Sequence, residues 1–125
     1  MSFFEAVSSC FSKYATFSGR ASRSEYWWFM LFWMLATTVI NLLVGSFLGA
    51  EVGSVIGLLV VLGLFLPTIA VSARRLHDMN HSGWWQLLAL TGIGGLVLVI
   101  WYMFPGSPDT NRFGEPVVAF QDQLA

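Results

Sequence analysis

Three long stretches of this chain carry no charged side chain, and they constrain its fold more than any other feature. They cover residues 26–50, 52–73 and 84–104. Charged residues make up only 10% of the whole chain and hydrophobic residues 56%, whereas about 25% of the residues of an ordinary soluble domain are charged. Too few polar side chains are available to cover a water-facing surface. The sequence therefore predicts a single-domain, all-α integral membrane protein.

The first two apolar stretches are each long enough to cross a bilayer as a helix. At 1.5 Å per residue, residues 26–48 and 52–73 extend for about 33–35 Å, which matches a hydrocarbon core about 30 Å thick. Ser22 and Glu25 form an S-x-x-E capping box before the first span, with Ser22 as the predicted N-cap. Asn41 is expected to face a neighbouring helix, because an unpaired amide is costly in lipid.

Gly53 and Gly57, four residues apart in the second predicted span, indicate a close contact between helices. Small residues at this spacing let two backbones approach each other within a membrane. We expect the face that holds both glycines to support a homo-oligomer. Pro67 lies in the same span and lacks a backbone donor, so a neighbouring helix is expected to satisfy the carbonyl that it leaves free.

Residues 84–104 form the third predicted span, with Ser82 as its N-cap. A glycine-rich segment, residues 92–95, interrupts this span, and a re-entrant hairpin is the competing interpretation. Each half of such a hairpin would contain about nine residues, which is too few to cross the membrane as a helix. We therefore predict one glycine-rich span, followed by a polar tail over residues 105–125.

Residues 1–18 carry apolar and polar side chains at helical spacing. One face holds Phe3, Phe4, Val7, Cys10, Phe11 and Tyr14. This pattern predicts an amphipathic helix that lies in the membrane interface. A helix packed on the rest of the protein outside the membrane is the alternative. Cys10 is the only cysteine, so no intramolecular disulfide can form.

The distribution of basic residues predicts the orientation of the chain. In a three-span protein, Arg112 lies on one side of the membrane and the other five of the six basic residues lie on the opposite side, namely Lys13, Arg20, Arg23, Arg74 and Arg75. Cytoplasmic loops carry the excess of Lys and Arg. The N-terminus and the bend between the second and third spans are therefore predicted to be cytoplasmic, and the C-terminal tail to lie outside. Aromatic residues would form an inner belt at Trp27, Trp28, Trp84 and Trp85 and an outer one at Trp101 and Tyr102.

The bend, residues 74–85, holds both histidines of the chain. His77 and His81 have the spacing of the H-E-x-x-H zinc motif. However, Asp78 is shorter than the glutamate that acts as a base in that motif, no third ligand is evident, and Asn80 favours a turn over a continuing helix. The sequence therefore predicts no metal site and no cofactor, and it leaves His77 and His81 as weak metal candidates.

Basic, acidic and aromatic side chains near the bend form the candidate binding site. Basic residues near a membrane surface attract anionic lipid head groups, with about 1 kcal/mol for each residue. Local ion pairs and ordinary membrane topology are the simpler interpretation of the same charges, and the two are compatible. The site predicted to contact lipid head groups or a partner protein comprises Arg20, Arg23, Glu25, Arg74, Arg75, His77, Asp78, Trp84, Trp85, Asn111 and Arg112.

Four sequence blocks together resemble a known family. They read GRASRSEYW at residues 19–27, RRLHD at 74–78, SGWW at 82–85 and NRFG at 111–114. In this order they are similar to the YhaH-like bacterial inner-membrane proteins, the family named domain of unknown function 805. The resemblance extends from about Phe4 to Pro116. It implies a small multi-span protein of the bacterial cytoplasmic membrane and brings no activity, cofactor or substrate. The family pattern varies where His81 stands, which disfavours a zinc pair.

The function predicted from the sequence is non-enzymatic: a small membrane component whose cytoplasmic-face cluster contacts lipid head groups, anionic ones among them, or a partner protein. The net charge of -1 provides no overall attraction for nucleic acid. Transport or its regulation is the alternative, and a metalloenzyme at His77 and His81 ranks third. In the three-span arrangement the block at residues 111–114 lies across the membrane from the bend. If the block at residues 111–114 and the bend instead build a single site, the number of spans differs from three by one.

Overall fold

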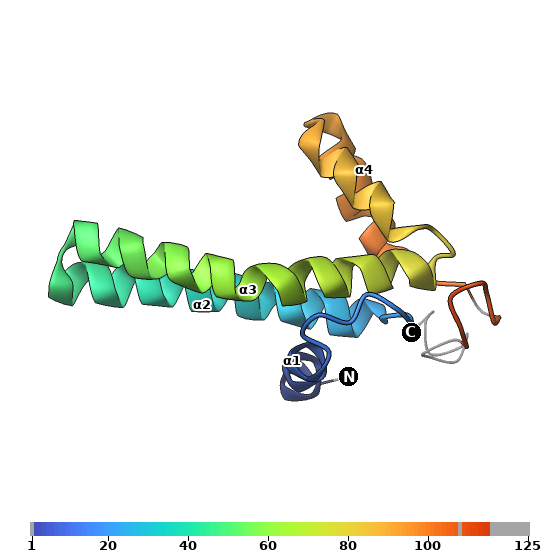
Figure 1. The fold of residues 1–125 in the computed structure, drawn as a ribbon, viewed down its shortest axis with the longest axis horizontal. Helices are drawn as coiled ribbons and strands as arrows, with labels where there is room; N and C mark the ends of the chain where they lie inside the picture. Colours follow the sequence, from blue (N-terminus) through green and yellow to red (C-terminus); the bar gives the residue numbers. More distant parts are fainter. Residues whose placement is uncertain (1, 108, 116–125) are drawn as a thin grey trace.

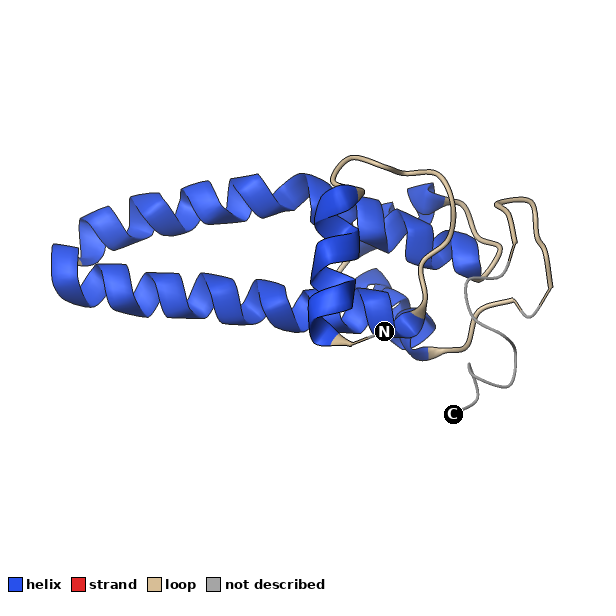
Figure 2. Ribbon diagram, turned by 90° about the horizontal axis from the view of Figure 1, so that it is seen from below, coloured by secondary structure: helices blue, strands red, loops and turns tan. Residues whose placement is uncertain are grey.

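The computed structural model describes residues 2–107 and 109–115, and this part of the chain is helical. Its elements are α1 (Phe3–Ser12), α2 (Arg23–Leu48), α3 (Ala50–Asp78), the 3₁₀ helix η1 (Gly83–Leu90) and α4 (Ile93–Met103). Figure 1 shows α2 and α3 as a long antiparallel hairpin, from which the segment that ends in α4 branches away. Figure 2 shows α1 lying crosswise to this hairpin. The described residues contain no strand.

Both of the first two predicted spans are single long helices. α2 has 26 residues and α3 has 29, and each is long and apolar enough to cross a membrane. At lengths of about 39 and 44 Å, both helices exceed the hydrocarbon thickness of about 30 Å. Ser22 caps α2 as predicted, because its Oγ accepts from the backbone N–H of Glu25 at 3.2 Å. The side chain of Glu25 turns instead to Arg74.

Small residues bring α2 and α3 together in the half of the hairpin that is far from the bend. A Cβ added at Gly53 would lie 2.8 Å from Cα of Gly45, and one at Gly57 would lie 2.1 Å from Oδ1 of Asn41. Asn41 therefore faces a neighbouring helix, as predicted, and that helix belongs to the same chain. The face of Gly53 and Gly57 that we expected to support a homo-oligomer is covered by α2. A second copy would have to displace α2 to reach it, and self-association itself stays a prediction.

The segment 84–104 does not form the single continuous span that the sequence predicted. η1 ends at Leu90, and Gly92 has a φ of +51°, a left-handed conformation that glycine adopts without a steric penalty. Thr91 terminates η1, because its hydroxyl donates to the carbonyl of Leu88 at 2.7 Å. The chain then reverses into α4. Each arm of this hairpin is about 16 Å long, about half the thickness of a hydrocarbon core. The segment therefore forms a hairpin, which was the competing interpretation of its sequence, and not a single span.

α1 is a short helix, ending at Ser12 rather than extending to residue 18. It buries Ala6 and Cys10 completely, while Phe4 remains 78% exposed. Phe11 packs edge-to-face on Phe32 of α2, with ring centroids 5.6 Å apart. The predicted helix is therefore present, and its placement in a membrane interface stays a prediction.

Pro67 lies inside α3 without ending it. A proline cannot donate to the carbonyl four residues earlier, which here belongs to Gly63. The hydroxyl of Tyr14 donates to that carbonyl instead. The freed carbonyl thus has a partner, as expected, but the donor comes from the turn after α1 and not from a neighbouring helix. Tyr14 ties the chain that follows α1 to the middle of α3.

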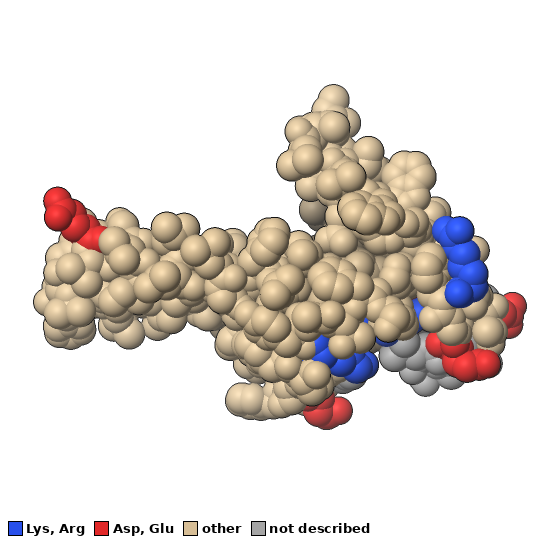
Figure 3. Space-filling model, in the orientation of Figure 1, with Lys and Arg blue, Asp and Glu red and all other residues tan. Residues whose placement is uncertain are grey.

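Charge divides the molecule into two regions. We call residues 34–66 of the α2–α3 hairpin the apolar arm, and residues 19–25, 72–83 and 102–115 the polar end. In Figure 3 the arm carries one acidic group, at its tip, where Glu51 lies in the first turn of α3. The blue and the other red side chains in this view gather toward the opposite end.

Candidate functional site: a buried arginine network

The site begins where α3 ends. Asn80 has a φ of +61°, a conformation that asparagine tolerates better than most residues. The N–H of Asn80 donates to the carbonyl of His77, and the N–H of His81 donates to that of Leu76, both at 2.9 Å. These two bonds form a Schellman motif. The turn predicted after Asp78 is thus confirmed, and the carbonyl of Asp78 remains available to other partners.

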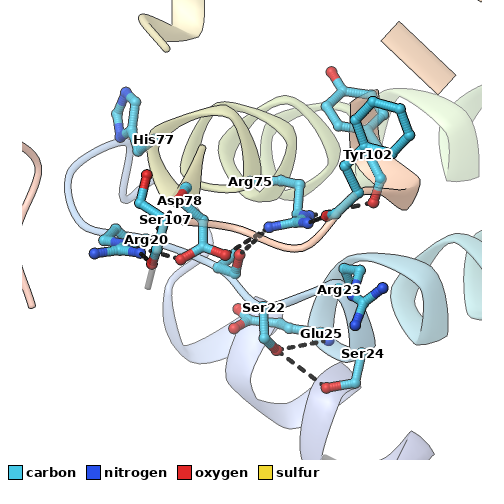
Figure 4. Close-up of polar contacts among 12 residues, drawn as sticks. Arg20, Ser22, Arg23, Ser24, Glu25, Arg75, His77, Asp78, Tyr102 and Ser107 are labelled. Atoms are coloured by element: carbon cyan, nitrogen blue, oxygen red, sulfur yellow. Dashed lines mark hydrogen bonds and ion pairs between the residues drawn. The ribbon is translucent and has the colours of Figure 1, made fainter. Parts of the chain in front are cut away.

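The carboxylate of Asp78 holds two arginines from different segments. Nε of Arg20 donates to Oδ1 at 2.8 Å, and Nη1 of Arg75 donates to Oδ2 at 2.6 Å. Figure 4 shows the three side chains converging beside the end of α3. All three residues are at most 5% exposed. Burying charges is costly unless each charge is paired and its remaining donors are bonded, so the other donors of these guanidiniums decide whether the cluster is stable.

Arg20 directs its remaining donors to main-chain carbonyls of the C-terminal segment. Its Nη1 donates to the carbonyls of Asp109 at 3.0 Å and Gly114 at 3.1 Å. Its Nη2 donates to the carbonyls of Ser107 at 2.6 Å and Asp78 at 3.2 Å. The backbone N–H of Ser107 also donates to the carbonyl of Asp78 at 2.6 Å. Arg20 therefore clamps the C-terminal segment onto the end of α3.

Arg75 performs the same role for the end of α4. Its Nε donates to the carbonyl of Tyr102 at 3.3 Å, and its Nη2 donates to that of Phe104. Its Nη1 also donates to the carbonyl of Ala21 at 3.3 Å. Every side-chain nitrogen of Arg20 and Arg75 is thus hydrogen-bonded. Together they hold three separate segments of the chain around Asp78.

The block at residues 111–114 lies against the bend. Nδ2 of Asn111 donates to the carbonyl of His77 at 3.0 Å. The ring of Phe113 stacks on the imidazole of His77, with centroids 3.9 Å apart and planes at 2°. The backbone of Gly106 also lies against the end of α3, because a Cβ added at Gly106 would lie 1.9 Å from Oδ2 of Asp78. The blocks at residues 19–27, 74–78 and 111–114 thus meet in one place.

The predicted position of the tail, across the membrane from the bend, is therefore wrong for residues 105–107 and 109–115. The physical reason is the hairpin of η1 and α4, which returns the chain to the end of α3 where it started. The guanidiniums of Arg20 and Arg75 then fix it there. Residues 116–125 of the predicted tail lie outside the described residues.

A second buried ion pair joins α2 to α3. Nη1 of Arg74 donates to Oε1 of Glu25 at 2.5 Å, and both side chains are 1% exposed. The same oxygen accepts from Oγ of Ser9 at 3.2 Å and lies 3.9 Å from Sγ of Cys10. This pair is incomplete: Oε2 of Glu25 and Nε and Nη2 of Arg74 are buried without a hydrogen-bond partner among the described residues.

Cys10 is unsuited to nucleophilic chemistry in this position. Burial raises the pKa of its thiol from 9.0 to about 12, and the neighbouring carboxylate of Glu25 contributes in the same direction. Because the thiolate is the reactive form of cysteine, the side chain behaves as a small apolar group at neutral pH.

The two other predicted arginines lie outside the network. Arg23 is partly buried and donates through Nη1 to the carbonyl of Met103 at 3.3 Å. Arg112 is exposed, with its guanidinium 4.8 Å from the centre of the Phe113 ring. It also donates to the carbonyl of Asn80 at 3.3 Å.

The predicted tryptophans of the site also lie apart from the buried charges. Trp84 is 78% exposed and Trp85 is 45% exposed. Trp85 packs edge-to-face on Trp101 with centroids 5.7 Å apart, and Tyr102 packs on Tyr26 at 4.4 Å. The predicted outer belt of Trp101 and Tyr102 is therefore wrong, because both residues lie with the aromatic side chains of the polar end.

The two histidines do not face each other as a ligand pair. Nδ1 of His77 lies 2.9 Å from the carbonyl of Gly19, whereas His81 stacks on Trp101 with centroids 4.8 Å apart. Across residues 2–107 and 109–115, no group of three His, Cys, Asp or Glu side chains could hold a metal ion.

Several residues that complete the network escaped the sequence analysis. The acceptors for Arg20 and Arg75 are mostly backbone carbonyls, which no side-chain pattern can reveal. Gly106 had one signal, the Pro-Gly pair at residues 105–106, which is typical of a tight turn. Phe113 stands within the fourth sequence block, and the block itself was its signal.

These features define a helical protein with two helices long and apolar enough to cross a membrane and a buried arginine network whose side chains come from the blocks at residues 19–27 and 74–78. The chain belongs to the DUF805 family, described as a protein of unknown function, which it matches over residues 14–115. The predicted family resemblance is thereby confirmed.

Two relatives from Escherichia coli (strain K12) share most of their length with this chain. The inner membrane protein YhaI is 40% identical over 107 residues, which cover 85% of this chain and 89% of YhaI. The inner membrane protein YhaH is 42% identical over 105 residues, which cover 81% of this chain and 86% of YhaH. No solved structure matches the chain.

Proposed function

We propose that this protein is a small, non-enzymatic component of the bacterial inner membrane that contacts lipids and a partner protein through its outer surface. The names of its relatives and its two long apolar helices support this location. One observation carries the functional part: the guanidiniums of Arg20, Arg74 and Arg75 are buried. They hold α3, α4 and the C-terminal segment together, so their role is structural and the contacts fall to other residues.

The same fold suggests a topology in which both described ends of the chain lie in the cytoplasm. α2 and α3 cross the bilayer, and the hairpin of η1 and α4 enters it to about half its depth. Among the charged residues that the structure describes, Glu51 alone then lies at the far side. Lys and Arg residues concentrate in cytoplasmic segments, and all six of them belong to the near side, namely Lys13, Arg20, Arg23, Arg74, Arg75 and Arg112.

In this topology the apolar arm faces lipid tails, and exposed aromatic and basic residues surround its base. Trp27 and Trp28 are 37% and 38% exposed at the start of α2, where amphipathic rings favour the head-group region. Arg23 and Arg112 are the arginines with accessible surface. In this proposal, anionic head groups contact these two arginines rather than the buried network.

Cysteine labelling in spheroplasts tests the topology. In a Cys10→Ala background, Glu51→Cys and Glu115→Cys each place one thiol at an exposed position. We expect an impermeant maleimide added outside to label the Glu51→Cys variant, and to label the Glu115→Cys variant only after permeabilisation. Labelling of the Glu115→Cys variant in sealed spheroplasts would refute the arrangement.

Lipid dependence tests the functional assignment. In nanodiscs, anionic lipid is expected to raise the thermal stability of the wild type more than that of an Arg23→Gln, Arg112→Gln double variant. An Asp78→Asn variant should be less stable overall but keep the wild-type response to anionic lipid. A double variant with an undiminished response would contradict the proposal.

Transport, or regulation of a transporter, is a second candidate, favoured by the half-length hairpin of η1 and α4. Short segments that enter a membrane without crossing it are tolerated where they line a water-filled path or are covered by protein. Flux of small ions into proteoliposomes tests this function. Flux equal to that of empty vesicles would remove it.

A further inference from the structure

The two sets of buried charges differ in how completely their polar atoms are paired. Around Asp78, all side-chain nitrogens of Arg20 and Arg75 donate hydrogen bonds. In the other pair, three buried atoms have no hydrogen-bond partner within the part of the chain that the structure describes, namely Oε2 of Glu25 and Nε and Nη2 of Arg74. Native proteins leave very few such atoms unpaired, and each one calls for an explanation. The element that covers this ion pair therefore excludes water from three atoms that would readily form hydrogen bonds with water.

α1 is the element that covers the pair. Ser9 and Cys10, near the end of α1, both approach Oε1 of Glu25. The side chains that α1 buries completely are small ones, Ala6 and Cys10, whereas Phe4 is exposed. The interface therefore lacks a large, fully buried anchor from α1. Loss of this interface would expose apolar rings such as Phe32, which a membrane interface tolerates better than water.

The rest of the polar end is built without α1. The side chains of Arg20, Arg75 and Asp78 form the hydrogen bonds described above with segments other than α1. The match to the family also begins at residue 14, after α1 ends. The network and the α2–α3 hairpin can therefore stay intact while α1 moves.

We propose that α1 is a lid over the Glu25–Arg74 ion pair, which undocks from α2 while the remaining fold persists. In the open state, water pairs the three atoms that lack partners in the closed state, and this gain offsets part of the contacts that α1 loses. The lid thus exchanges between a closed form, in which Ser9 bonds to Glu25, and an open form, in which the ion pair is hydrated.

Thiol labelling of the full chain in detergent micelles and in lipid vesicles tests the lid. Native Cys10 reports from α1, and the Ala6→Cys variant in a Cys10→Ala background reports from a second buried position of the same helix. The Ala70→Cys variant in the same background reports from α3, where Ala70 is fully buried. Labelling with N-ethylmaleimide is followed by mass spectrometry under native conditions.

We expect both α1 positions to be labelled at similar rates, and at least tenfold faster than position 70. Equal rates at all three positions would mean that only global unfolding exposes α1, and would overturn the proposal. Fast labelling at position 6 with slow labelling of Cys10 would also overturn it, because that result describes fraying of the first turn.

Two serines of α1 provide a matched pair of variants. Ser9 donates to Glu25, whereas Ser8 is exposed. Ser9→Ala should accelerate labelling of Cys10 about fivefold, the effect of losing one ordinary hydrogen bond, and Ser8→Ala should leave the rate unchanged. Equal rates in the two variants would contradict a lid held by this carboxylate.

Removing the ion pair tests the role of hydration. In the Ala6→Cys reporter that also carries Ser9→Ala, so that the bond to Glu25 is absent from both proteins compared, adding the double variant Glu25→Leu, Arg74→Met removes the unpaired polar atoms that could be hydrated, so labelling should slow at least fivefold. Unchanged or faster labelling in a folded double variant would refute hydration as the cause of opening. The serine pair decides the question of the lid independently if the double variant does not fold.

Discussion

The apolar arm and the polar end are two parts of the same hairpin, and they are packed by opposite means. In the arm, α2 and α3 approach through glycines and one amide, with Gly53 against Gly45 and Gly57 against Asn41. In the polar end, the contacts between segments are made by buried charges, with Asp78 between Arg20 and Arg75. Most of the large side chains of the arm point outward, among them Leu58 and Leu62 at 59% each.

This difference follows from what each region has to join. The arm consists of two helices already linked by a short turn, so close backbone contact between small residues suffices. The polar end has to hold α4 and the C-terminal segment, whose backbone carbonyls lack regular partners. Arginine supplies several donors in a fixed plane, so one buried side chain can bind carbonyls from several segments. The arm is therefore expected to respond to changes in side-chain volume, and the polar end to changes in charge.

The largest effect is expected at Asp78. Replacing it by alanine leaves two buried guanidiniums without their carboxylate, and breaking a buried pair in this way costs about 3–5 kcal/mol. The Asp78→Ala variant should therefore unfold at much lower denaturant concentration in detergent. It should also become sensitive to proteases between residues 105 and 115.

Asp109 provides the matched control for Asp78. It is exposed and contributes to the network only through its backbone carbonyl, so Asp109→Ala should change the free energy of unfolding by less than about 0.5 kcal/mol. Similar stability of the two variants would show that the carboxylate of Asp78 does not organise the polar end.

Glycine substitutions test the arm, with an intermediate effect. Gly53→Ala should destabilise by about 1–3 kcal/mol, a typical cost of overpacking, because its Cβ would meet the backbone of Gly45. Gly57→Ala should cost less, since the group it meets is the end of the Asn41 side chain, which can rotate. Unfolding in mixed micelles measures both substitutions, and Gly63→Ala serves as their control.

Gly63 has open space around the position of its Cβ. Gly63→Ala should therefore stabilise the helix by up to about 1 kcal/mol, the difference in helix propensity between the two residues. If Gly53→Ala proves as harmless as Gly63→Ala, the helices of the arm are not in close contact.

The bond between Tyr14 and Gly63 ties the segment after α1 to the apolar arm and should contribute about 1 kcal/mol. Tyr14→Phe removes the hydroxyl that satisfies the carbonyl left free by Pro67. Pro67→Ala restores a backbone donor for that carbonyl, so Tyr14→Phe should become nearly silent in its presence. A double-mutant cycle on the free energy of unfolding measures this coupling. Equal effects of Tyr14→Phe with and without Pro67 would exclude the explanation.

Features that depend on neighbouring residues in the sequence were predictable. The two long helices follow from the length of uncharged sequence, and the cap at Ser22 follows from the hydroxyl three residues before a glutamate. Asn41 and Pro67 were predictable for a related reason, because each leaves a polar group that has to find a partner in an apolar setting. In each case the cost is local, so the sequence alone reveals it.

The hairpin of η1 and α4 could not be predicted in the same way. Gly92 permits a reversal but does not require one, and the length of the apolar stretch favoured an uninterrupted span. The buried guanidiniums of Arg20 and Arg75 need carbonyl acceptors, and the chain that returns after α4 supplies them. This need decides between the hairpin and the span. Backbone acceptors have no signature in a sequence. For the same reason, three basic residues that predicted a surface for head groups proved to be buried.

The smallest effect concerns Cys10 and alkaline pH. In the folded protein, burial holds the pKa of the thiol near 12, above its ordinary value of 9.0. The folded state therefore binds this proton more tightly than the unfolded state. The resulting stability is fully present below pH 9 and is lost as the pH rises toward 12.

The stability of the wild type should thus fall more steeply above pH 9 than that of a Cys10→Ala variant, by less than about 1 kcal/mol at pH 9.5. Below pH 8 the two pH profiles of unfolding should be parallel, because the thiol is neutral in both states of the protein. Comparing the two proteins cancels the contribution of tyrosines and lysines that titrate in the same range. Profiles that stay parallel up to pH 11 would mean that Cys10 is hydrated in the folded state. Water would then reach the interface between α1 and α2 more readily than it reaches the ion pairs around Asp78.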